Sequence, residues 1–264
     1  MSNKIYGVVG CGWLGMPVAK KWIQEQKTVH GTTTSADKIK TLEEAGIIAH
    51  VLNSDKNNEA TQWLSKLDYI LLNIPPSNLK EEYGSFMLKI VKQLKHEARI
   101  IFISSTSVYA NNNNLVTEKG ELEGTRRNSA YLINAEKMLQ DFAMDRLTII
   151  RMAGLVGEDR NPAIYMQGRE ISGGEEPVNL IHLEDCIGIV DHILDRSIWG
   201  ETFNGSAPIH PTKKEYYTYA AKELKIEPPK FDDKSIAFKI IDSNKIIEEF
   251  GYTFVHPDPF DFPL

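Results

Sequence analysis

Three glycines near the start of the chain have the spacing of a phosphate-binding turn. The motif GCGWLG at positions 10–15 follows an apolar segment, residues 5–9, and precedes a helical pattern. Such glycines permit a tight turn, close approach of the backbone to a pyrophosphate, and tight packing of helix on strand. The helix N-terminus also favours phosphate. We therefore expect a dinucleotide to contact Gly10, Gly12, Trp13, Leu14 and Gly15. The alternative is a glycine-rich turn that binds no ligand.

The segment after the second expected strand bears on which dinucleotide binds. It reads HGTTTS at positions 30–35 and contains no acid before Asp37, whereas NAD sites usually place an acid there for the ribose hydroxyls. Hydroxyls followed by Lys38 suit a 2′-phosphate better, so we expect NADP, with NAD as the alternative. The expected contacts are Thr33, Thr34 and Ser35, together with Ile74, Pro75 and Ser104. Ser35 can also cap the following helix.

Strands and helices must alternate to position these residues. Continuous apolar segments such as DYILLN at 68–73 and RIIFIS at 99–104 are typical of strands covered on both faces. The other expected strands are 5–9, 28–31, 47–52 and 147–151, and the expected helices are 14–22, 36–45, 79–95 and 129–144. This alternation predicts a Rossmann-type, doubly wound parallel α/β sheet.

The pattern changes after residue 154, where glycine, proline and charged residues become frequent. We expect a dinucleotide-binding domain over residues 1–154 and a smaller, irregular substrate-binding lobe over 155–264. Residues 178–206, which include a strand-like segment and a helical pattern, are expected to return to the first domain.

Composition narrows the possible partners and compartment. The net charge is −6 and the isoelectric point is near 5.7, which disfavours a broad nucleic-acid surface. Cys11 and Cys186 show no metal-ligand spacing, so we expect neither a structural zinc site nor disulfides. No signal-peptide core and no apolar run of about 18 residues occur. We therefore expect a cytoplasmic protein that acts on a small molecule.

Three further segments carry a family resemblance. They are FISSTSVY at 102–109, IRMAGLVGEDRNP at 150–162 and VNLIHLED at 178–185. Their order and spacing resemble the signatures of extended short-chain dehydrogenases/reductases, the NAD-dependent epimerase/dehydratase family. With the glycine loop, the resemblance spans about residues 5–211. It implies a nicotinamide cofactor and oxidoreductase or epimerase chemistry on a polar, sugar-like hydroxyl or ketone.

The resemblance also implies catalytic residues. Ser105 occupies the place of the family's serine or threonine that hydrogen-bonds the reacting oxygen, although a serine at a strand end can simply satisfy backbone groups. Tyr131 occupies the place of the acid–base tyrosine, or it packs on one helix face with its apolar neighbours. Arg160 could bind a substrate anion or remain solvated. His182 beside two acids suggests a relay, but a hydrogen-bonded histidine at a strand end is the favoured interpretation.

Two departures from the family pattern affect the expected chemistry. Val9 replaces the first glycine of GxxGxxG, and Ala135 stands where the lysine of YxxxK should follow Tyr131. None of the ten tyrosines has a lysine four residues later. An unassisted tyrosine has a pKa of about 10, so forming its phenolate at pH 7 costs roughly 4 kcal/mol. The combination resembles the atypical branch of the family.

Three functions remain open at this point. The first is an NADP-dependent oxidoreductase of the epimerase/dehydratase type whose active site lacks the usual lysine. The second is an NADP-binding sensor or regulatory protein with little turnover. The third is a β-hydroxyacid dehydrogenase, because residues 10–17 and 35–42 resemble the start of that family. That family would continue with a long, all-helical domain, which the segment at 178–185 and the proline-rich tail do not suggest.

Overall fold

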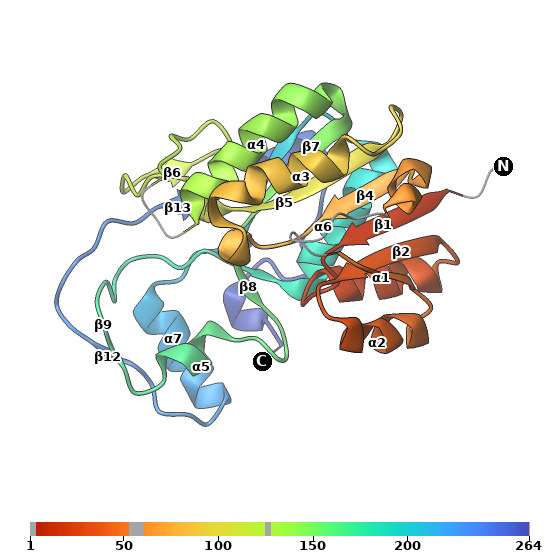
Figure 1. Ribbon diagram of the computed structural model, residues 1–264. Helices are drawn as coiled ribbons and strands as arrows, with labels where there is room; N and C mark the ends of the chain where they lie inside the picture. Colours follow the sequence, from red (N-terminus) through yellow and green to blue (C-terminus); the bar gives the residue numbers. More distant parts are fainter. Residues whose placement is uncertain (1–3, 53–60, 125–127, 264) are drawn as a thin grey trace. The chain divides into compact units, whose positions relative to one another are not determined.

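A seven-stranded sheet forms the centre of the fold. The computed structural model describes residues 4–52, 61–124 and 128–263 (Figure 1). The strand order is β11-β7-β5-β4-β1-β2-β3, and the β2–β3, β1–β2, β1–β4 and β4–β5 pairs are parallel. This order confirms the expected doubly wound α/β sheet. The strands are β1 (Ile5–Val9), β2 (Thr28–Thr33), β3 (Ile48–Val51), β4 (Tyr69–Leu72), β5 (Arg99–Ser105), β7 (Leu147–Met152) and β11 (Thr202–Gly205).

Helices cover both faces of this sheet. The helices α1 (Gly15–Gln24) and α2 (Ile39–Glu44) lie on one face, and α3 (Tyr83–Val91) and α4 (Ser129–Ala143) lie on the other (Figure 1). The apolar residues of α1 recur every four positions, and Leu14 before it, Val18 and Trp22 are all buried. The sheet therefore buries the helix faces that the sequence periodicity predicts.

The helix expected over residues 79–95 is shorter in the structure. Two 3-10 turns, η3 (Pro76–Asn78) and η4 (Lys80–Glu82), precede α3, which begins at Tyr83. Lys80 has a φ of +45°, outside the right-handed helical region, so the chain changes direction before α3 can begin. The turns place Glu81 just before the N-terminus of α3.

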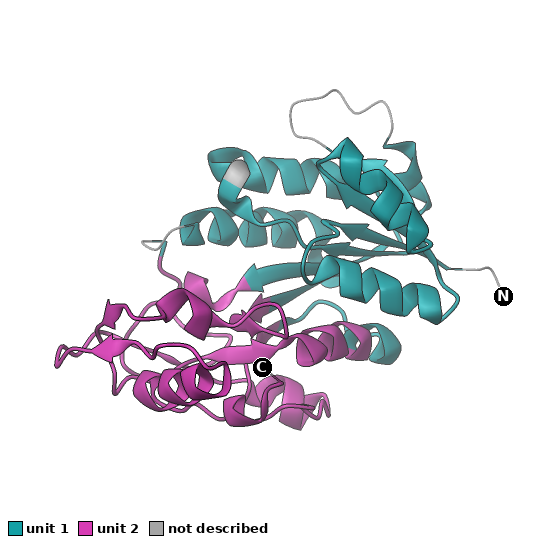
Figure 2. Cartoon of the chain, turned by 90° about the horizontal axis from the view of Figure 1, so that it is seen from below, with its two compact units in different colours: residues 1–104, 124–150, 193–202 teal, residues 105–123, 151–192, 203–264 magenta. Residues whose placement is uncertain are grey.

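The chain divides into two compact units that are both discontinuous in sequence (Figure 2). Unit 1 comprises residues 1–104, 124–150 and 193–202, and it contains the glycine loop and helices α1 to α4. Unit 2 comprises residues 105–123, 151–192 and 203–264. Several signature segments that the sequence suggested for one functional site therefore belong to different units.

Unit 2 is built from short elements around its own apolar core. Its strand pairs are β8 (Gly154–Val156) with β10 (Leu180–His182), β9 (Glu170–Ile171) with β12 (Lys230–Phe231), and β6 (Leu115–Val116) with β13 (Ile240–Ile241). The helices are α5 (Pro162–Met166), the start of α6 (Leu183–Arg196), and α7 (Lys213–Glu223). Thr212 and Glu215 form a reciprocal capping box at the start of α7, a helix that was not among those expected from the sequence.

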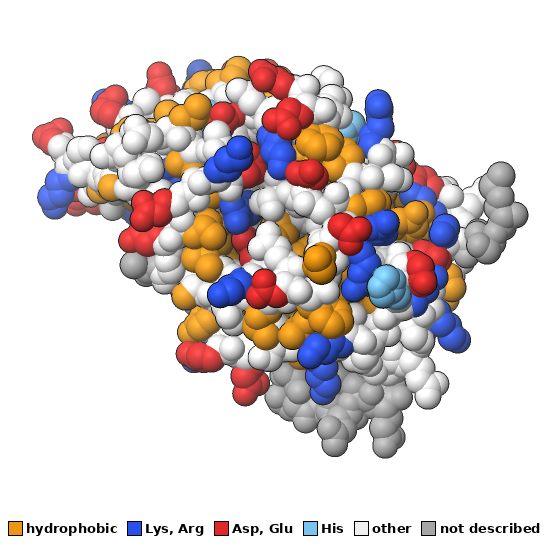
Figure 3. Space-filling model, turned by 90° about the horizontal axis from the view of Figure 1, so that it is seen from above, with side chains coloured by type: hydrophobic (Ala, Val, Ile, Leu, Met, Phe, Trp, Pro, Cys, Tyr) orange, Lys and Arg blue, Asp and Glu red, His pale blue; other side chains and the backbone are white. Residues whose placement is uncertain are grey.

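The surface carries both signs of charge. On the face drawn in Figure 3, lysine and arginine side chains are interspersed with aspartate and glutamate. Among the described helices, none is long and apolar enough to cross a bilayer.

Candidate cofactor and active-site residues

The glycine loop after β1 has three glycines in three different environments. Gly10 has a φ of +101°, and a Cβ there would lie 2.8 Å from the carbonyl oxygen of Asn73. A Cβ on Gly15 would lie 2.1 Å from the carbonyl oxygen of Gly10. A Cβ on Gly12 would meet no atom within 4 Å among the described residues. Gly10 and Gly15 are therefore required by the fold, whereas the fold leaves the space at Gly12 open.

Neighbouring strands hold the loop in place. The backbone N–H of Gly10 donates to Thr32 Oγ1 at 2.9 Å, and the N–H of Cys11 donates to the Thr32 carbonyl at 3.0 Å. From the other side, the Asn73 side chain donates to the Gly10 carbonyl at 3.3 Å. Neither Thr32 nor Asn73 was among the expected site residues. A signal for both exists in the sequence, because each is a polar residue at the carboxyl end of a strand beside β1.

The start of α1 suits an anion. Leu14, the residue before the helix, makes no side-chain capping bond, and the first turn holds no acidic residue. The first N–H groups of a helix have no intrahelical acceptor, and the helix dipole adds positive potential there. Leu14 itself is buried and Trp13 is half-buried, so a cofactor contact of either stays a prediction.

Hydroxyl groups follow the end of β2. Thr33 Oγ1 accepts the backbone N–H of Ser35 at 3.2 Å, while the Thr34 side chain is exposed. Ser35 precedes the short turn η1 (Ala36–Lys38) without making a side-chain capping bond. The segment thus presents neutral hydroxyls, and no carboxylate, at the position where an NAD site places its acid.

Hydrogen bonds fix two other segments that were expected to contact the cofactor. After β4, Tyr83 donates its hydroxyl proton to the Ile74 carbonyl at 2.7 Å, while Pro75 is exposed. At the end of β5, Ser104 donates to Glu136 Oε1 on α4 at 2.5 Å, and both side chains are buried. The Ser104 hydroxyl therefore links β5 to α4 by a hydrogen bond. Its contact with a cofactor stays a prediction.

The environment of Tyr131 opposes phenolate formation. Its hydroxyl donates to Glu81 Oε1 at 3.0 Å. This hydrogen bond to a carboxylate, followed by partial burial and the carboxylate charge, raises the pKa of Tyr131 above its ordinary value. In the resembling family the tyrosine is made more acidic by lysine. Here Glu81, which contacts the hydroxyl, raises the pKa instead. No sequence pattern indicates that Glu81 contacts Tyr131.

Ala135 occupies a close helix–helix contact. It is fully buried in α4, and a Cβ on Gly84 of α3 would lie 3.4 Å from the Ala135 Cα. The same Cβ would approach the side chains of Asn134 and Met138 to 2.8 Å. Position 135 is therefore a packing position of unit 1, which is a physical reason why a small residue stands where the family pattern has lysine.

In unit 2, Ser105 caps the short turn that follows β5. Its hydroxyl accepts the backbone N–H of Ser107 at 3.1 Å. This bond agrees with the structural role considered for a serine at a strand end, and it leaves one acceptor lone pair and the hydroxyl proton for another partner. A catalytic role for Ser105 stays a prediction.

Two signature residues of the resemblance contact one another. Arg151 donates to the Tyr109 hydroxyl at 2.8 Å, and its guanidinium lies 4.9 Å from the Tyr109 ring centroid. The Tyr109 hydroxyl in turn donates to Asn204 Oδ1 at 2.7 Å, and all three residues are buried. The tyrosine and arginine of these motifs thus form a structural network in unit 2. Arg160 is exposed in the turn that Gly157 closes, so its expected anion contact stays a prediction.

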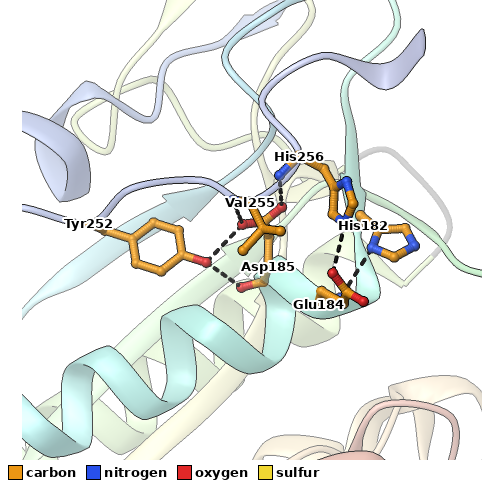
Figure 4. Close-up of polar contacts among 6 residues, drawn as sticks. All are labelled: His182, Glu184, Asp185, Tyr252, Val255 and His256. Carbon is orange, nitrogen blue, oxygen red and sulfur yellow. Dashed lines mark hydrogen bonds and ion pairs between the residues drawn. The ribbon is translucent and has the colours of Figure 1, made fainter. Parts of the chain in front are cut away.

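The VNLIHLED segment contributes a polar cluster in unit 2 (Figure 4). His182 is buried, and its Nδ1 accepts the backbone N–H of Glu184 at 3.3 Å, which agrees with the hydrogen-bonded histidine favoured from the sequence. Asp185 contacts a distant part of the chain, where it accepts bonds from Tyr252 and His256. The sequence carries no local signal for these partners.

Comparisons with known proteins agree with this geometry. Residues 5–125 match the family model of the NAD binding domain of 6-phosphogluconate dehydrogenase. Over 273 aligned residues the chain is 32% identical to Protein YeeZ of Escherichia coli K12, covering 99% of each chain.

Solved structures with similar folds have low sequence identity. One is dTDP-glucose 4,6-dehydratase from Bacillus anthracis in complex with NAD (TM-score 0.77, 15% identity, 97% of this chain and 94% of that chain). Another is UDP-glucuronic acid 4-epimerase from Bacillus cereus in complex with NAD (TM-score 0.75, 15% identity, 97% and 95%). A functionally unknown protein from Silicibacter pomeroyi is equally similar (TM-score 0.77, 17% identity, 97% and 95%). These likenesses establish the fold.

Proposed function

Because the chain belongs to the same family as Protein YeeZ of Escherichia coli, with which it aligns over 99% of both lengths, we propose one function for the whole chain. It is an NADP(H)-binding oxidoreductase of the epimerase/dehydratase type, with weak turnover at neutral pH. Its substrate is a polar, sugar-like hydroxyl or ketone. The observation that carries the cofactor part of the proposal is the open position at Gly12, where no described residue lies within 4 Å of an added Cβ, because the middle glycine of this motif lets the backbone approach a pyrophosphate.

The residues of unit 1 fit such a cofactor. The N-terminus of α1 and the glycine loop would hold the pyrophosphate, and Thr33, Thr34 and Ser35 would receive the 2′-phosphate. When bound, the nicotinamide supplies a hydride acceptor or donor. The chain's own part is to orient the substrate and to move the hydroxyl proton, for which Ser105 and Tyr131 are the proposed groups.

The cofactor part is tested by titrating NADPH and NADH while following nicotinamide fluorescence. We expect NADPH to bind more tightly, because the end of β2 carries hydroxyls and no acid. Thr33→Asp should reverse the preference, since a carboxylate repels a 2′-phosphate and accepts bonds from a free ribose. This carboxylate can also keep the bond that Thr33 accepts from Ser35. A clear preference of the unmodified protein for NADH would refute the NADP assignment.

The catalytic part is tested by hydride transfer on nucleotide-sugar and ketone substrates. Turnover should be low at pH 7 and rise towards pH 10, because Glu81 disfavours the Tyr131 phenolate. Tyr131→Phe should abolish the activity and Ser105→Ala should reduce it. Full activity in Tyr131→Phe would mean that Tyr131 only packs, and the acid–base group would have to be Ser105 or another residue.

The Glu81 contact also favours a second candidate, an NADP-binding sensor with little or no turnover. A sensor would bind NADPH with the same preference but show no hydride transfer at any pH between 7 and 10. The β-hydroxyacid dehydrogenase alternative is supported by the match over residues 5–125. We do not propose it, because the described part of unit 2 contains strands β8, β9, β10, β12 and β13 where that family has a long helical domain.

A further inference from the structure

Three potential metal ligands converge at the start of α6. Potential ligand atoms of His182, Glu184 and His256 all lie within 4.8 Å of one another. His256 Nε2 lies 2.7 Å from Glu184 Oε2, and His182 Nδ1 faces the backbone N–H of Glu184 at 3.3 Å. In Figure 4 the contacts of both imidazole rings run to Glu184. Two imidazole nitrogens and one carboxylate are a donor set that binds zinc.

A buried carboxylate holds the His256 segment against α6. Asp185 is fully buried, and it accepts the backbone N–H groups of Val255 at 2.7 Å and His256 at 2.9 Å. It also accepts the Tyr252 hydroxyl at 2.8 Å. The backbone of His256 is therefore fixed beside Glu184, independently of the contact between their side chains. Such supporting hydrogen bonds are what a metal site needs to be preorganised.

His182 is a buried group with unused hydrogen-bonding capacity. It is 4% exposed, and its Nε2 has no hydrogen-bond partner among the described residues. Burial, followed by the charge of His256, lowers the pKa of His182 below its ordinary value. Because Nδ1 accepts the long bond from Glu184, the neutral ring carries its proton on Nε2. The lone pair of Nδ1 is therefore on the Glu184 side, and a metal ion would take it in place of the long 3.3 Å contact with the Glu184 N–H.

The surroundings favour a cation and leave a way in. The negative charges of Glu184, Asp185 and Glu158 favour a positive charge at His182. The Glu184 side chain is 59% exposed, so a hydrated ion can reach it from solvent. The centroid of the Phe262 ring lies 5.5 Å from that of the His182 ring and 6.1 Å from that of the His256 ring. This contact limits the movement of both imidazoles.

We propose that His182 Nδ1, Glu184 and His256 Nε2 bind one Zn²⁺ ion, with water as the fourth ligand, at a site that the cysteine spacing gave no reason to expect. Tetrahedral zinc with bonds of about 2.0–2.1 Å needs ligand atoms about 3.3 Å apart. The potential ligand atoms now lie within 4.8 Å of one another, and Glu184 Oε2 and His256 Nε2 are 2.7 Å apart, so the side chains must adjust on binding, most easily the exposed Glu184. The ion clamps the segment around His256 to the start of α6. The zinc ligands lie in unit 2, whereas the proposed cofactor contacts all lie in unit 1.

The test is Zn²⁺ binding by the full-length, tag-free protein after EDTA treatment, measured at pH 7.5 against a fluorescent chelator. We expect one equivalent of Zn²⁺ to bind and the Tm to rise by about 5 °C at saturating metal. Co²⁺ should give the visible absorption of a tetrahedral site. Glu184→Gln keeps the side-chain volume and removes the anionic ligand, and it should weaken binding at least about tenfold. His256→Ala should do the same.

The matched control is His96→Ala, which removes an exposed histidine of unit 1 and should bind Zn²⁺ like the unmodified protein. Circular dichroism in EDTA checks that each variant folds. If His256→Ala fails to fold, Glu184→Gln decides, because its side chain is largely exposed. The proposal is overturned if the unmodified protein binds no stoichiometric Zn²⁺, or if Glu184→Gln binds it with unchanged affinity.

Discussion

Replacing Gly12 with valine separates the fold of the glycine loop from its proposed binding role. Gly12 is exposed, and its Cβ position is free of neighbours within 4 Å among the described residues. The substitution should therefore change the free energy of unfolding by no more than about 0.5 kcal/mol, as for an ordinary surface position. Any large loss of NADPH affinity would then mean that the valine side chain occupies the position of the cofactor, and not that the protein is unfolded.

The expected loss of affinity follows from the hydrogen bonds that the side chain prevents. Each hydrogen bond between a backbone N–H and a charged phosphate contributes about 1.5–3 kcal/mol. If the valine keeps the pyrophosphate from two such groups, the loss is about 3–6 kcal/mol, or roughly 150- to 20,000-fold in Kd. Gly12→Ala should have a smaller effect in the same direction, because it adds only the Cβ.

Two measurements on the same samples provide the assay, namely NADPH titration by fluorescence and urea denaturation by circular dichroism. Gly15→Ala is the contrasting variant, since its Cβ would lie 2.1 Å from the Gly10 carbonyl oxygen and 3.0 Å from Val8 Cγ1. It should lose both binding and about 1–3 kcal/mol of stability. If Gly12→Val folds normally and binds NADPH within about threefold of the unmodified protein, no phosphate approaches Gly12 and the proposed binding mode is wrong.

Three further outcomes follow from the described contacts. Ala135→Lys, which would restore the family's lysine, should destabilise the protein by about 3 kcal/mol or more, because it buries an unpaired charge against Gly84; an unchanged urea midpoint would contradict this. Burial lowers the pKa of His50 to about 4. The contribution of the neutral His50 to the free energy of unfolding is therefore fully present above pH 6.5, and it is lost as the pH falls towards 4. The full shift corresponds to about 2 kcal/mol between pH 7.5 and 5, and solvent screening of this half-buried ring reduces it. The unmodified protein should therefore lose about 1 kcal/mol more than His50→Gln in urea denaturation, and equal losses would exclude the effect. Tyr109→Phe should cost about 1–3 kcal/mol of stability with NADPH affinity unchanged, and weakened NADPH binding would place Tyr109 in the cofactor site.

The parts of the fold that were predictable are those with local patterns. The motif at 10–15 predicted the glycine loop because turn geometry, helix start and strand end are all encoded within a few neighbouring residues. The apolar segments at 68–73 and 99–104 predicted β4 and β5 for the same reason. The helix expected at 79–95 was less accurate, because the positive φ of Lys80 is not a property that its residue type reveals.

The candidate site was less predictable because its decisive contacts join distant residues. The absence of lysine at position 135 was visible in the sequence, but its physical reason, close packing against Gly84, required the structure. The same holds for Glu81, 50 residues from Tyr131 in the chain. Arg151 and Tyr109 belong to separate motifs, and only the structure shows that they contact one another.

The buried carboxylate of Asp185 also has a consequence for how the protein is made. Its partners Tyr252 and His256 lie 67 and 71 residues later in the chain. At about 5–20 residues per second, a ribosome needs several seconds after adding Asp185 before these partners exist. During this interval the start of α6 cannot close over the carboxylate without leaving it unsatisfied, so Asp185 stays hydrated in the nascent chain. Unit 2 is thereby prevented from completing its fold before unit 1, whose last segment ends at residue 202, has been synthesised.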